Sequence, residues 1–456
     1  MPKNRGEAWR KRRAGSRQRK RRRSAPGEMF GHVRREGHDR RDGAVLGQPD
    51  AFDEALARRI GPLTNVRIRA CLTPRPRAVI EADPEGKHVF WFTTHFSGYD
   101  RKKHDAGLAH YLPVNLGEIP DYYRRFIDPP DIVVFKTAPM DTQGFFNFGP
   151  NTLWMRALVE RGRVVIVEET PNLPYVMGQG TGVHVSEVDY IIPGHAGPMA
   201  ALPKGAATEV DKAVARLIAE EIEDGACLQI GIGGMPNAVC SLLAESPVSD
   251  LGIHTEMMTD GIVDLYRAGR VTGAKKQINP GKMVCTFALG AQYLYDFLDH
   301  NPEVEFHPVE YTNLPHVIMQ NDKVVAINNT TQVDLQGQAA SESDGFRHIS
   351  GTGGQLQFMR GAYASRGGKS FMCLASTYDK KGERRSRIVT ALTRGNVVTT
   401  PRTDIMYVVT EYGMVNLKGR SIAERAKLLI SIAHPDFREE LERDAHEHRL
   451  IPRGFF

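Results

Sequence analysis

The sequence predicts an α/β protein built from two successive α/β halves, and three features of the 456-residue chain lead to this fold class. Short β-branched runs alternate with segments of helical spacing, which is the pattern of βαβ units and parallel sheets. A segment rich in Pro, Gly and Ala interrupts this alternation near the middle of the chain, and the alternation then resumes. The hydrophobic content of 41% is enough for more than one core.

The first half contains three predicted strands and one clear predicted helix. NVRIRACL from Asn65, DIVVFKTA from Asp131 and RVVIVEE from Arg163 are rich in β-branched residues and are expected to be buried strands. Between the last two, TLWMRALVERG at residues 152–162 has helical spacing and a terminal glycine. This order indicates a β-α-β unit.

The segment IIPGHAGPMAALPKGAA, residues 191–207, lacks a periodic apolar face and is expected to separate the halves. We therefore expect an N-terminal α/β domain at residues 43–203 and a C-terminal α/β domain at residues 204–450. The second half opens with an amphipathic helix, whose apolar residues share one face: Val210, Val214, Leu217, Ile218 and Ile222. A turn at Asp224 and Gly225 then leads into the predicted strand ACLQIGIG.

A short internal echo favours a duplicated architecture. Asp141-Thr-Gln-Gly144 in the first half and Asp334-Leu-Gln-Gly337 in the second each follow a strand-like run. Two such motifs are a weak indication of repeated folding units.

The positive charge is confined to the N-terminus. Residues 1–41 contain 16 Lys/Arg and four Asp/Glu, a net charge of +12 against +6 for the whole chain, so residues 42–456 carry −6. The run from Arg10 to Arg23 has no apolar periodicity and its like charges repel, so residues 1–42 are predicted to be a disordered basic extension. The extension lacks the apolar core of a secretory signal, and nucleic-acid binding through it is only a distant alternative.

Composition argues against several other classes. No apolar run approaches the ~18 residues that suggest a membrane span, and the mean hydropathy is −0.37, so we expect a soluble protein without a membrane partner. The five cysteines are scattered and never spaced as CxxC, which indicates neither a disulfide framework nor a zinc site. The expected location is the reducing cytoplasm, and no metal is expected.

The first candidate binding site is the segment GIGGMPNAV, residues 231–239. Its glycines follow a predicted strand and precede the predicted helix NAVCSLLAE, and Pro236 stands where a first helical turn tolerates proline. Backbone amides at such a helix start can hold a phosphate or an oxyanion. The candidate residues are Gly231, Ile232, Gly233, Gly234 and Met235. Tight packing of a helix on a sheet explains the glycines equally well, and neither a dinucleotide fingerprint nor a P-loop is present.

Glu256 is the candidate catalytic residue. In LGIHTEMMTDGIVDLYRAG, residues 251–269, LGIHTE is predicted to be a short buried strand and MMTDGIVDLYRAG the following helix. Glu256 then lies at the carboxyl end of a strand, where open α/β sheets bind ligands, and its carboxylate could act as a nucleophile or a base. A role in capping the helix is the simpler alternative for Glu256 and for Asp260. His254 on this apolar strand is best interpreted as a buried core histidine.

A third glycine cluster, ISGTGGQLQF at residues 349–358, supplies further candidates. The backbone amides of Gly353 and Gly354 could bind an anion, and Lys369 lies beyond the stretch GAYASRGG that follows the cluster, just before a predicted strand. Loop flexibility is the competing explanation for these glycines. Asn313 is a candidate amide donor, although asparagine before such a turn is usually structural.

Together these segments resemble the acetyl-CoA hydrolase/transferase family over roughly residues 60–440, and most closely its 4-hydroxybutyrate and butyryl-CoA:acetate CoA-transferase branch. The supporting stretches, in order, are GIGGMPNAV, LGIHTEMMTDGIVDLY, GAKKQINPGKMVCTFALG, SGTGGQ and VVTEYGMVNLKGRSIAERAKLLISIAHPDFREEL. Several such blocks in one order are more specific than any single motif. The resemblance implies two open α/β domains of related fold, packed face to face, with the active site between them.

The resemblance also implies roles for the candidate residues. Glu256 falls on the catalytic glutamate of the family and would form a glutamyl-CoA thioester. Gly231 to Met235 would line the CoA and oxyanion region, Gly353 and Gly354 would lie in the opposite loop, and Asn313 would contact the thioester. The implied reaction moves CoA between a short-chain acyl-CoA and a carboxylate such as acetate, with CoA as a substrate and with no metal or other cofactor. The relatives imply a homo-oligomer.

The sequence leaves three points open. The second acid could be butyrate, propionate or 4-hydroxybutyrate, and a hydrolase that admits water would use the same glutamate. An inactive CoA-binding or nucleic-acid-associated protein is a more distant alternative.

Only GAVLGQPDAFDEALARRIG at residues 43–61 resembles the family's opening strand-turn-helix unit, so the first β-α unit is predicted to be incomplete and the first sheet to lack an edge.

Overall fold

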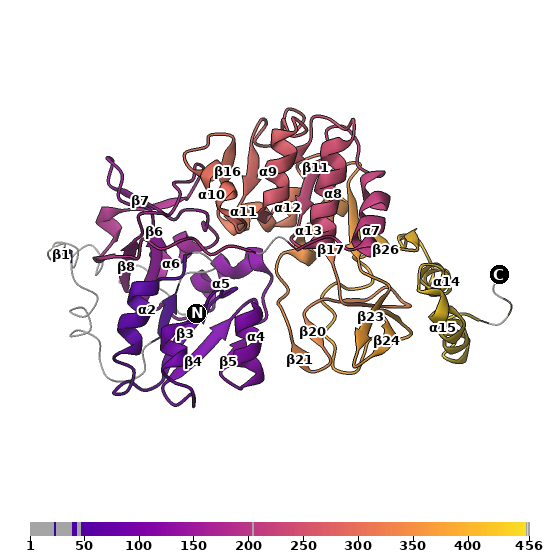
Figure 1. Cartoon of the computed structure of the whole chain (residues 1–456), viewed down its shortest axis with the longest axis horizontal. Helices are drawn as coiled ribbons and strands as arrows, with labels where there is room; N and C mark the ends of the chain where they lie inside the picture. Colours follow the sequence, from indigo (N-terminus) through magenta and orange to yellow (C-terminus); the bar gives the residue numbers. More distant parts are fainter. Residues whose placement is uncertain (1–21, 24–38, 43–46, 203–204, 453, 455–456) are drawn as a thin grey trace, which may run out of the picture.

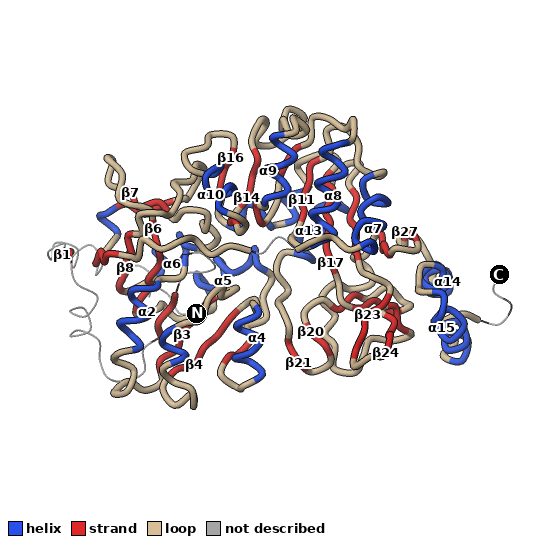
Figure 2. The backbone as a smooth tube through the Cα atoms, in the orientation of Figure 1, coloured by secondary structure: helices blue, strands red, loops and turns tan. Residues whose placement is uncertain are grey.

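The computed structural model describes residues 22–23, 39–42, 47–202, 205–452 and 454. Figure 1 shows two halves that follow one another along the chain and lie against each other, each with its own mainly parallel sheet. Figure 2 shows helices around both sheets. The last strand of the first sheet ends at Pro193 and the first helix of the second half begins at Glu209, while the predicted boundary at residues 203 and 204 lies outside the described residues.

The first half forms an eight-stranded sheet in the described part of the chain, and all its neighbouring strands are parallel. In spatial order the strands are β1 (Arg22–Arg23), β10 (Tyr190–Pro193), β8 (Val164–Glu169), β6 (Ile132–Thr137), β2 (Asp39–Asp42), β3 (Val66–Ala70), β4 (Val89–Thr93) and β5 (Ala109–Tyr111). The predicted strands at β3, β6 and β8 and the predicted helix α6 (Met155–Arg161) are confirmed.

Both faces of this sheet are covered by helices, so its strands are apolar throughout. In β6, Val133 and Phe135 pack towards α5 (Ile119–Arg125) and α6, whereas Ile132 and Val134 pack towards α2 (Asp50–Ala57) and α3 (Ala78–Glu81). Burial on two faces accounts for the continuous β-branched runs in the sequence. Among the described residues of this half, the other α-helix is α4 (Gly98–Asp105), which follows β4.

The prediction of a disordered extension and an incomplete first β-α unit is wrong for residues 39–42. These residues form β2, which pairs with β6 on one side and β3 on the other and is followed by α2. A strand between two neighbours is held by backbone hydrogen bonds on both edges, and these do not depend on side-chain type. β1 also comes from the basic segment, and the rest of residues 1–42 lies outside the described residues.

The second half has a six-stranded sheet that is parallel apart from its last pair. In spatial order the strands are β12 (Gly252–Ile253), β11 (Cys227–Ile230), β17 (Val324–Asn329), β22 (Lys369–Cys373), β26 (Tyr407–Thr410) and β27 (Gly413–Asn416). Its helices are α7 (Glu209–Ala219), α8 (Gly234–Glu245), α9 (Asp260–Arg267), α10 (Gln292–Leu298), α11 (Val309–Asn313), α12 (Pro315–Ile318), α13 (Gln355–Ala364), α14 (Ile422–Ser431) and α15 (Pro435–Glu447).

Short strand pairs and one three-stranded sheet complete the described parts of both halves. They are β7 (Phe145–Asn147) with β9 (Gly182–His184), β13 (Met257–Met258) with β15 (Phe287–Ala288), β14 (Met283–Cys285) with β16 (Val304–Phe306), β18 (Gln332–Asp334) with β19 (Ala339–Ala340) and β25 (Ile388–Val389), β20 (Ser343–Asp344) with β21 (Arg347–His348), and β23 (Thr377–Lys380) with β24 (Glu383–Ser386). No described helix is long and apolar enough to cross a membrane.

Two predicted helices begin at other residues than expected. The helix predicted directly after Glu256 begins at Asp260, because Met257 and Met258 pair with β15 instead of joining the helix. The helix predicted to start at Asn237 begins at Gly234. Proline is accepted at the third residue of this helix because its first amides have no partner within the helix.

The echo between the halves corresponds to the same turn in both. Asp141 Oδ1 accepts hydrogen bonds from the backbone amides of Gln143 and Phe145, and Asp334 Oδ1 accepts them from the amides two and four residues later. The glycines that end the two motifs both have positive φ, 84° and 91°. This equivalence supports a duplicated fold.

Candidate active site

The strand order of the second sheet places a ligand site between β11 and β17. The chain runs from β11 through α8 to β12 on one side, and from β17 through α13 to β22 on the other. Loops at the carboxyl ends of the strands diverge at such a reversal and leave a crevice there. Gly231 and Ile232 leave β11 at this point, Asn328 lies near the end of β17, and all three line a cavity that also contains Glu256.

The Glu256 carboxylate lies in this cavity with two hydrogen-bond donors. Asn313 Nδ2, at the end of α11, donates to Glu256 Oε2 over 2.6 Å. Thr312 Oγ1 donates to Asn313 Oδ1 over 2.9 Å, which fixes the orientation of the amide so that its nitrogen faces the carboxylate. The backbone amide of Gly354, at the start of α13, hydrogen bonds to the same carboxylate.

The close approach of Gly354 depends on its lack of a side chain. A methyl group built on Gly354 would overlap Glu256 Oε2 and Asn313 Nδ2. The φ of Gly354 is −98°, which other residues also adopt, so the requirement for glycine here is one of space. The preceding Gly353 has φ 57°, and a Cβ built on it would lie 3.6 Å from His95 Cε1.

Burial raises the pKa of Glu256 to about 7, and the hydrogen bonds from Asn313 and Gly354 oppose part of this increase. The carboxyl is therefore balanced between its two protonation states near neutral pH. Burial also raises the pKa of the Cys71 thiol to about 12 and, together with His348 and Arg101, lowers that of His95 to about 4. At pH 7 Glu256 is thus the group in this cavity that changes charge.

The first half supplies the opposite wall of the cavity, which the sequence analysis missed. Its lining residues are Cys71, Leu72, His95, Leu116 and Leu153. The first three directly follow β3 and β4, so the carboxyl ends of both parallel sheets face the same cavity. Applying the strand-end rule to the first half would have indicated them.

Leu153 links this wall to the second half. Its φ of 34° is rare for a leucine, and the second half holds it through hydrogen bonds from Leu153 N to Thr286 O (3.3 Å) and from Val309 N to Leu153 O (2.8 Å). Leu72, in the same wall, also has a positive φ, 48°. Two constrained leucines thus lie in the wall opposite Glu256.

The remaining predicted site residues divide into two groups. Gly231 and Ile232 line the cavity, whereas Gly233, with φ 120°, and Gly234 form the turn into α8, and Met235 is buried in the core of the second half. The structure therefore brings part of the GIGGM segment to Glu256, and the rest of it packs α8 against the sheet.

Lys369 is not brought to the site, and its prediction as a site residue is corrected. It is the first residue of β22, at the end of the parallel sheet opposite the strand ends that face Glu256. Its Nζ donates to the backbone carbonyl and to Oε2 of Glu221, over 3.0 and 2.9 Å. The ion pair with Glu221 and the position at the amino end of the strand explain this outcome.

His254 and Asp260, the two other polar residues near Glu256 in the sequence, have structural roles. His254 is fully buried and its Nε2 lies 2.9 Å from Thr312 O, so it is the core histidine that was expected. Asp260 accepts a 3.0 Å hydrogen bond from the amide of Ala291, the residue that precedes α10. Asp260 therefore stabilises a helix start, and Glu256 remains available in the cavity.

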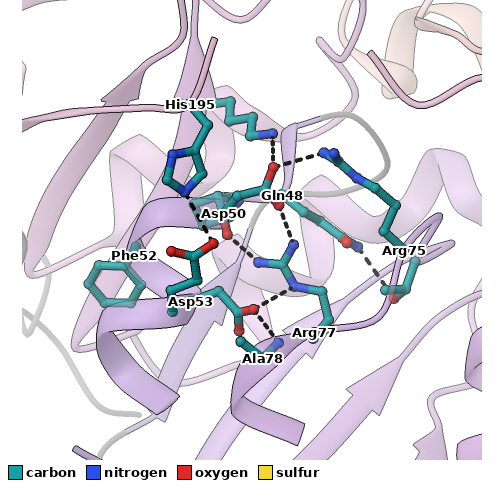
Figure 3. A network of polar contacts seen from close by, with 12 residues as sticks. Gln48, Asp50, Phe52, Asp53, Arg75, Arg77, Ala78 and His195 are labelled. Atoms are coloured by element: carbon teal, nitrogen blue, oxygen red, sulfur yellow. Dashed lines mark hydrogen bonds and ion pairs between the residues drawn. The ribbon is translucent and has the colours of Figure 1, made fainter. Parts of the chain in front are cut away.

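The corresponding strand reversal in the first sheet, between β2 and β6, carries an ion-pair network instead (Figure 3). Asp50 accepts hydrogen bonds from Lys136 (2.5 Å), Arg77 (2.9 Å) and Arg75 (2.8 Å). Lys136 is the fifth residue of β6, as Asn328 is of β17. The amides of Asp50 and Phe52 at the start of α2 already bind the Glu168 carboxylate. The backbone amides that could bind an anion at this position are therefore occupied by a carboxylate of the protein itself.

This network leads to a stability prediction. Arg77 is 2% exposed and contacts both Asp50 and Asp53, so Arg77→Ala is expected to lower the free energy of unfolding by about 3–5 kcal/mol by leaving a buried carboxylate without its cation. Arg75 binds the same Asp50 but is 44% exposed, so Arg75→Ala should cost only about 0–1 kcal/mol. Urea unfolding of both variants measures the difference, and equal losses would contradict this account.

The fold and the site define a class of two-domain α/β proteins with a buried glutamate between the facing strand ends of two related sheets. Residues 8–203 match the acetyl-CoA hydrolase/transferase N-terminal domain and residues 290–445 match the acetyl-CoA hydrolase/transferase C-terminal domain. The chain belongs to the acetyl-CoA hydrolase/transferase family.

Similar proteins match most of the chain. A butyryl-CoA:acetate CoA-transferase of Anaerostipes caccae is 47% identical over 89% of this chain and 92% of its own length. A 4-hydroxybutyrate coenzyme A transferase of Clostridium kluyveri is 42% identical over 75% of this chain and 79% of its own length. The crystal structure of RipA from Yersinia pestis has a TM-score of 0.86 and 36% identity, covering 94% of this chain and 98% of that one.

Proposed function

We propose that this protein transfers CoA between a short-chain acyl-CoA and a small carboxylic acid, with Glu256 as the nucleophile and a glutamyl-CoA thioester as the intermediate. The observation that carries this proposal is the buried carboxylate held by Asn313 Nδ2 and the Gly354 amide in a cavity between two domains. The CoA-transferase names of similar proteins support it.

The first step requires a free carboxylate oxygen. Asn313 donates to Oε2, which leaves Oε1 to attack the carbonyl carbon of the acyl-CoA. The bond to sulfur then breaks, giving a mixed anhydride between Glu256 and the acyl group, and CoA leaves as a thiolate. A carboxylate is a suitable nucleophile because the energy of the thioester is retained in the anhydride.

The second step uses the donors that already surround Glu256. The CoA thiolate attacks the Glu256 side-chain carbonyl of the anhydride, and the negative charge develops on Oε2. Asn313 Nδ2 and the Gly354 amide face this carboxylate and are therefore suited to stabilise the oxyanion. Release of the first acid leaves CoA bound to Glu256 as a thioester, and a second carboxylate reverses both steps. In this proposal neither ATP nor a metal takes part.

The pH dependence of transfer tests the role of the carboxylate. Only ionised Glu256 attacks, so kcat/KM is expected to rise with pH through an apparent pKa of about 7 and to level off above it. Cys71 and His95, with pKa values of about 12 and about 4, do not titrate in this interval. Initial rates between pH 5.5 and 8.5 measure the profile, and a flat profile over this interval, as an ordinary glutamate pKa of 4.5 would give, would contradict the burial argument.

The lining of the cavity indicates the class of acid. Beside Glu256 it presents mainly apolar side chains: Leu72, Leu116, Leu153, Met257, Phe287 and Phe358. No lysine or arginine is among the described lining residues, and His95 is neutral at pH 7. A second carboxylate would therefore lose its hydration without gaining a cation.

We expect monocarboxylic acids with short apolar chains to be preferred over dicarboxylic acids. The measurement is kcat/KM for acetate, propionate, butyrate and succinate as acceptors from one acyl-CoA. Butyrate is expected to exceed succinate by about tenfold or more, corresponding to at least ~1.4 kcal/mol. Equal values for the two acids would contradict this selection by charge.

Hydrolysis is the second candidate, because the family includes both activities. It would follow if water instead of a carboxylate discharged either intermediate. The test is to quantify free CoA and the new acyl-CoA in one reaction of acetyl-CoA with labelled butyrate. Transfer predicts labelled butyryl-CoA that accounts for the acetyl-CoA consumed, whereas butyrate-independent release of free CoA would establish hydrolysis.

A further inference from the structure

The loop that presents Gly354 to Glu256 is held in part by the other domain. Residues 349–354 belong to the second half, yet their carbonyls accept hydrogen bonds from the first half. The three bonds are Arg101 Nη1 to Ile349 O (2.8 Å), Phe96 N to Ser350 O (3.2 Å) and Leu116 N to Gly353 O (2.9 Å). The position of the Gly354 amide thus depends on contacts across the domain interface.

Tyr111, the last residue of β5, makes the most specific of these contacts. Its hydroxyl accepts a hydrogen bond from the Thr352 amide (3.1 Å) and donates one to Glu342 Oε2 (2.8 Å). Thr352 Oγ1 donates to the same carboxylate oxygen over 3.1 Å. The three residues form a closed set of hydrogen bonds two positions before Gly354.

Further contacts hold both Glu342 and Tyr111 in place. Glu342 is 4% exposed, and its other oxygen accepts a 3.0 Å hydrogen bond from Thr399 Oγ1. The His348 ring stacks on the Tyr111 ring with 3.6 Å between centroids. A hydroxyl that lies between a buried carboxylate and a backbone amide leaves the loop little freedom to move, because any shift breaks charge-assisted hydrogen bonds.

We propose that Tyr111 is a positioning residue for the reaction, which holds Thr352 so that the Gly354 amide stays directed at the Glu256 carboxylate. This proposal rests on the proposed function of Glu256 as the nucleophile. Through Tyr111 the first domain determines the geometry of an oxyanion donor that belongs to the second domain.

Loss of this positioning is expected to change the pKa of Glu256 in one direction only. The hydrogen bond from Gly354 stabilises the charged carboxylate, so weakening it raises the pKa of Glu256 and removes part of the oxyanion stabilisation. Asn313 also donates to Glu256, and the other titratable groups that line the cavity, the Cys71 thiol and the His95 ring, are uncharged near pH 7. A change in the pH profile therefore reports the Gly354 contact.

The test is Tyr111→Phe, which keeps the stacked ring and removes only the hydroxyl. We expect kcat to fall by about 5- to 20-fold and the midpoint of the acidic limb of the pH–rate profile to move upward by about 0.5 to 1 pH unit. The matched control is Tyr99→Phe, since Tyr99 OH donates to Glu81 over 2.7 Å in the same domain but outside the loop. The control should leave kcat and the midpoint unchanged.

A second measurement does not require turnover. The difference in Tm between the protein and Glu256→Gln, followed from pH 4.5 to 9, reports the folded-state pKa of Glu256. In the Tyr111→Phe background this curve should reach its plateau at a pH about 0.5 to 1 unit higher. An unshifted curve together with an unshifted rate profile would overturn the proposal, whatever happens to kcat. If Glu256→Gln itself retains full transfer activity, the proposed function fails instead, and the two failures are distinguishable.

Discussion

The Glu256→Gln variant is expected to lose CoA transfer by about 10³-fold or more. Glutamine has nearly the shape of glutamate and can still accept hydrogen bonds from Asn313 and Gly354, but its amide is not a nucleophile towards a thioester. The measurement is the initial rate of acyl exchange between acetyl-CoA and labelled butyrate. Glu54→Gln, at a carboxylate that is 48% exposed on α2, is the control and should retain full activity.

Relative to the unsubstituted protein, the same variant is expected to gain stability as the pH rises. Folding raises the pKa of Glu256 from the ordinary 4.5 to about 7, so the folded state binds the proton more tightly. The stabilisation from this proton is complete below pH 4.5 and is lost as the pH rises through 7. Glu256→Gln does not incur this loss. The free energy of unfolding of the variant minus that of the unsubstituted protein should therefore be about 1–3 kcal/mol larger at pH 8 than at pH 4.5. A Tm difference that is constant between these pH values would contradict the raised pKa.

Gly354→Ala is expected to reduce transfer by about 10²- to 10³-fold while the protein stays folded. The added methyl group overlaps Glu256 Oε2 and Asn313 Nδ2, so the carboxylate, its amide donor or the loop must move. Loss of one oxyanion donor has an effect of this size in other acyl-transfer enzymes. Because φ at Gly354 is −98°, alanine introduces no backbone strain.

Steady-state kinetics and thermal unfolding together check the Gly354 prediction. Gly61→Ala is the control, because a methyl group at Gly61 meets nothing within 4 Å and its exposed position is outside the cavity. Both variants should unfold within a few degrees of the unsubstituted protein. An active Gly354→Ala variant would show that the close contact between residue 354 and Glu256 is not needed for transfer.

Much of the fold could be predicted from local patterns. Strands such as β3, β6 and β8 are buried on both faces, and their continuous β-branched runs are visible in the sequence. β2 was missed because its residues, Asp-Arg-Arg-Asp, have no such pattern. Its place between β3 and β6 depends on backbone pairing with strands that lie far away in the sequence.

The candidate site divides in a similar way. Glu256 follows a strand and Gly354 lies in a glycine cluster, so their positions and the local composition were enough to predict both as site residues. The prediction of Lys369 as a site residue did not take into account that Lys369 begins a strand. Residues that begin the strands of a parallel sheet lie at the end opposite the ligand. Leu153 and His95 were missed because their nearness to Glu256 results from the packing of one domain on the other.

The most direct test of the central claim is peptide mass spectrometry after incubation with butyryl-CoA in the absence of an acceptor acid. We expect a CoA adduct on the peptide that contains Glu256, which is lost on addition of acetate and is absent from Glu256→Gln. Turnover without this adduct, or an adduct that persists in Glu256→Gln, would contradict the claim that Glu256 carries CoA during transfer.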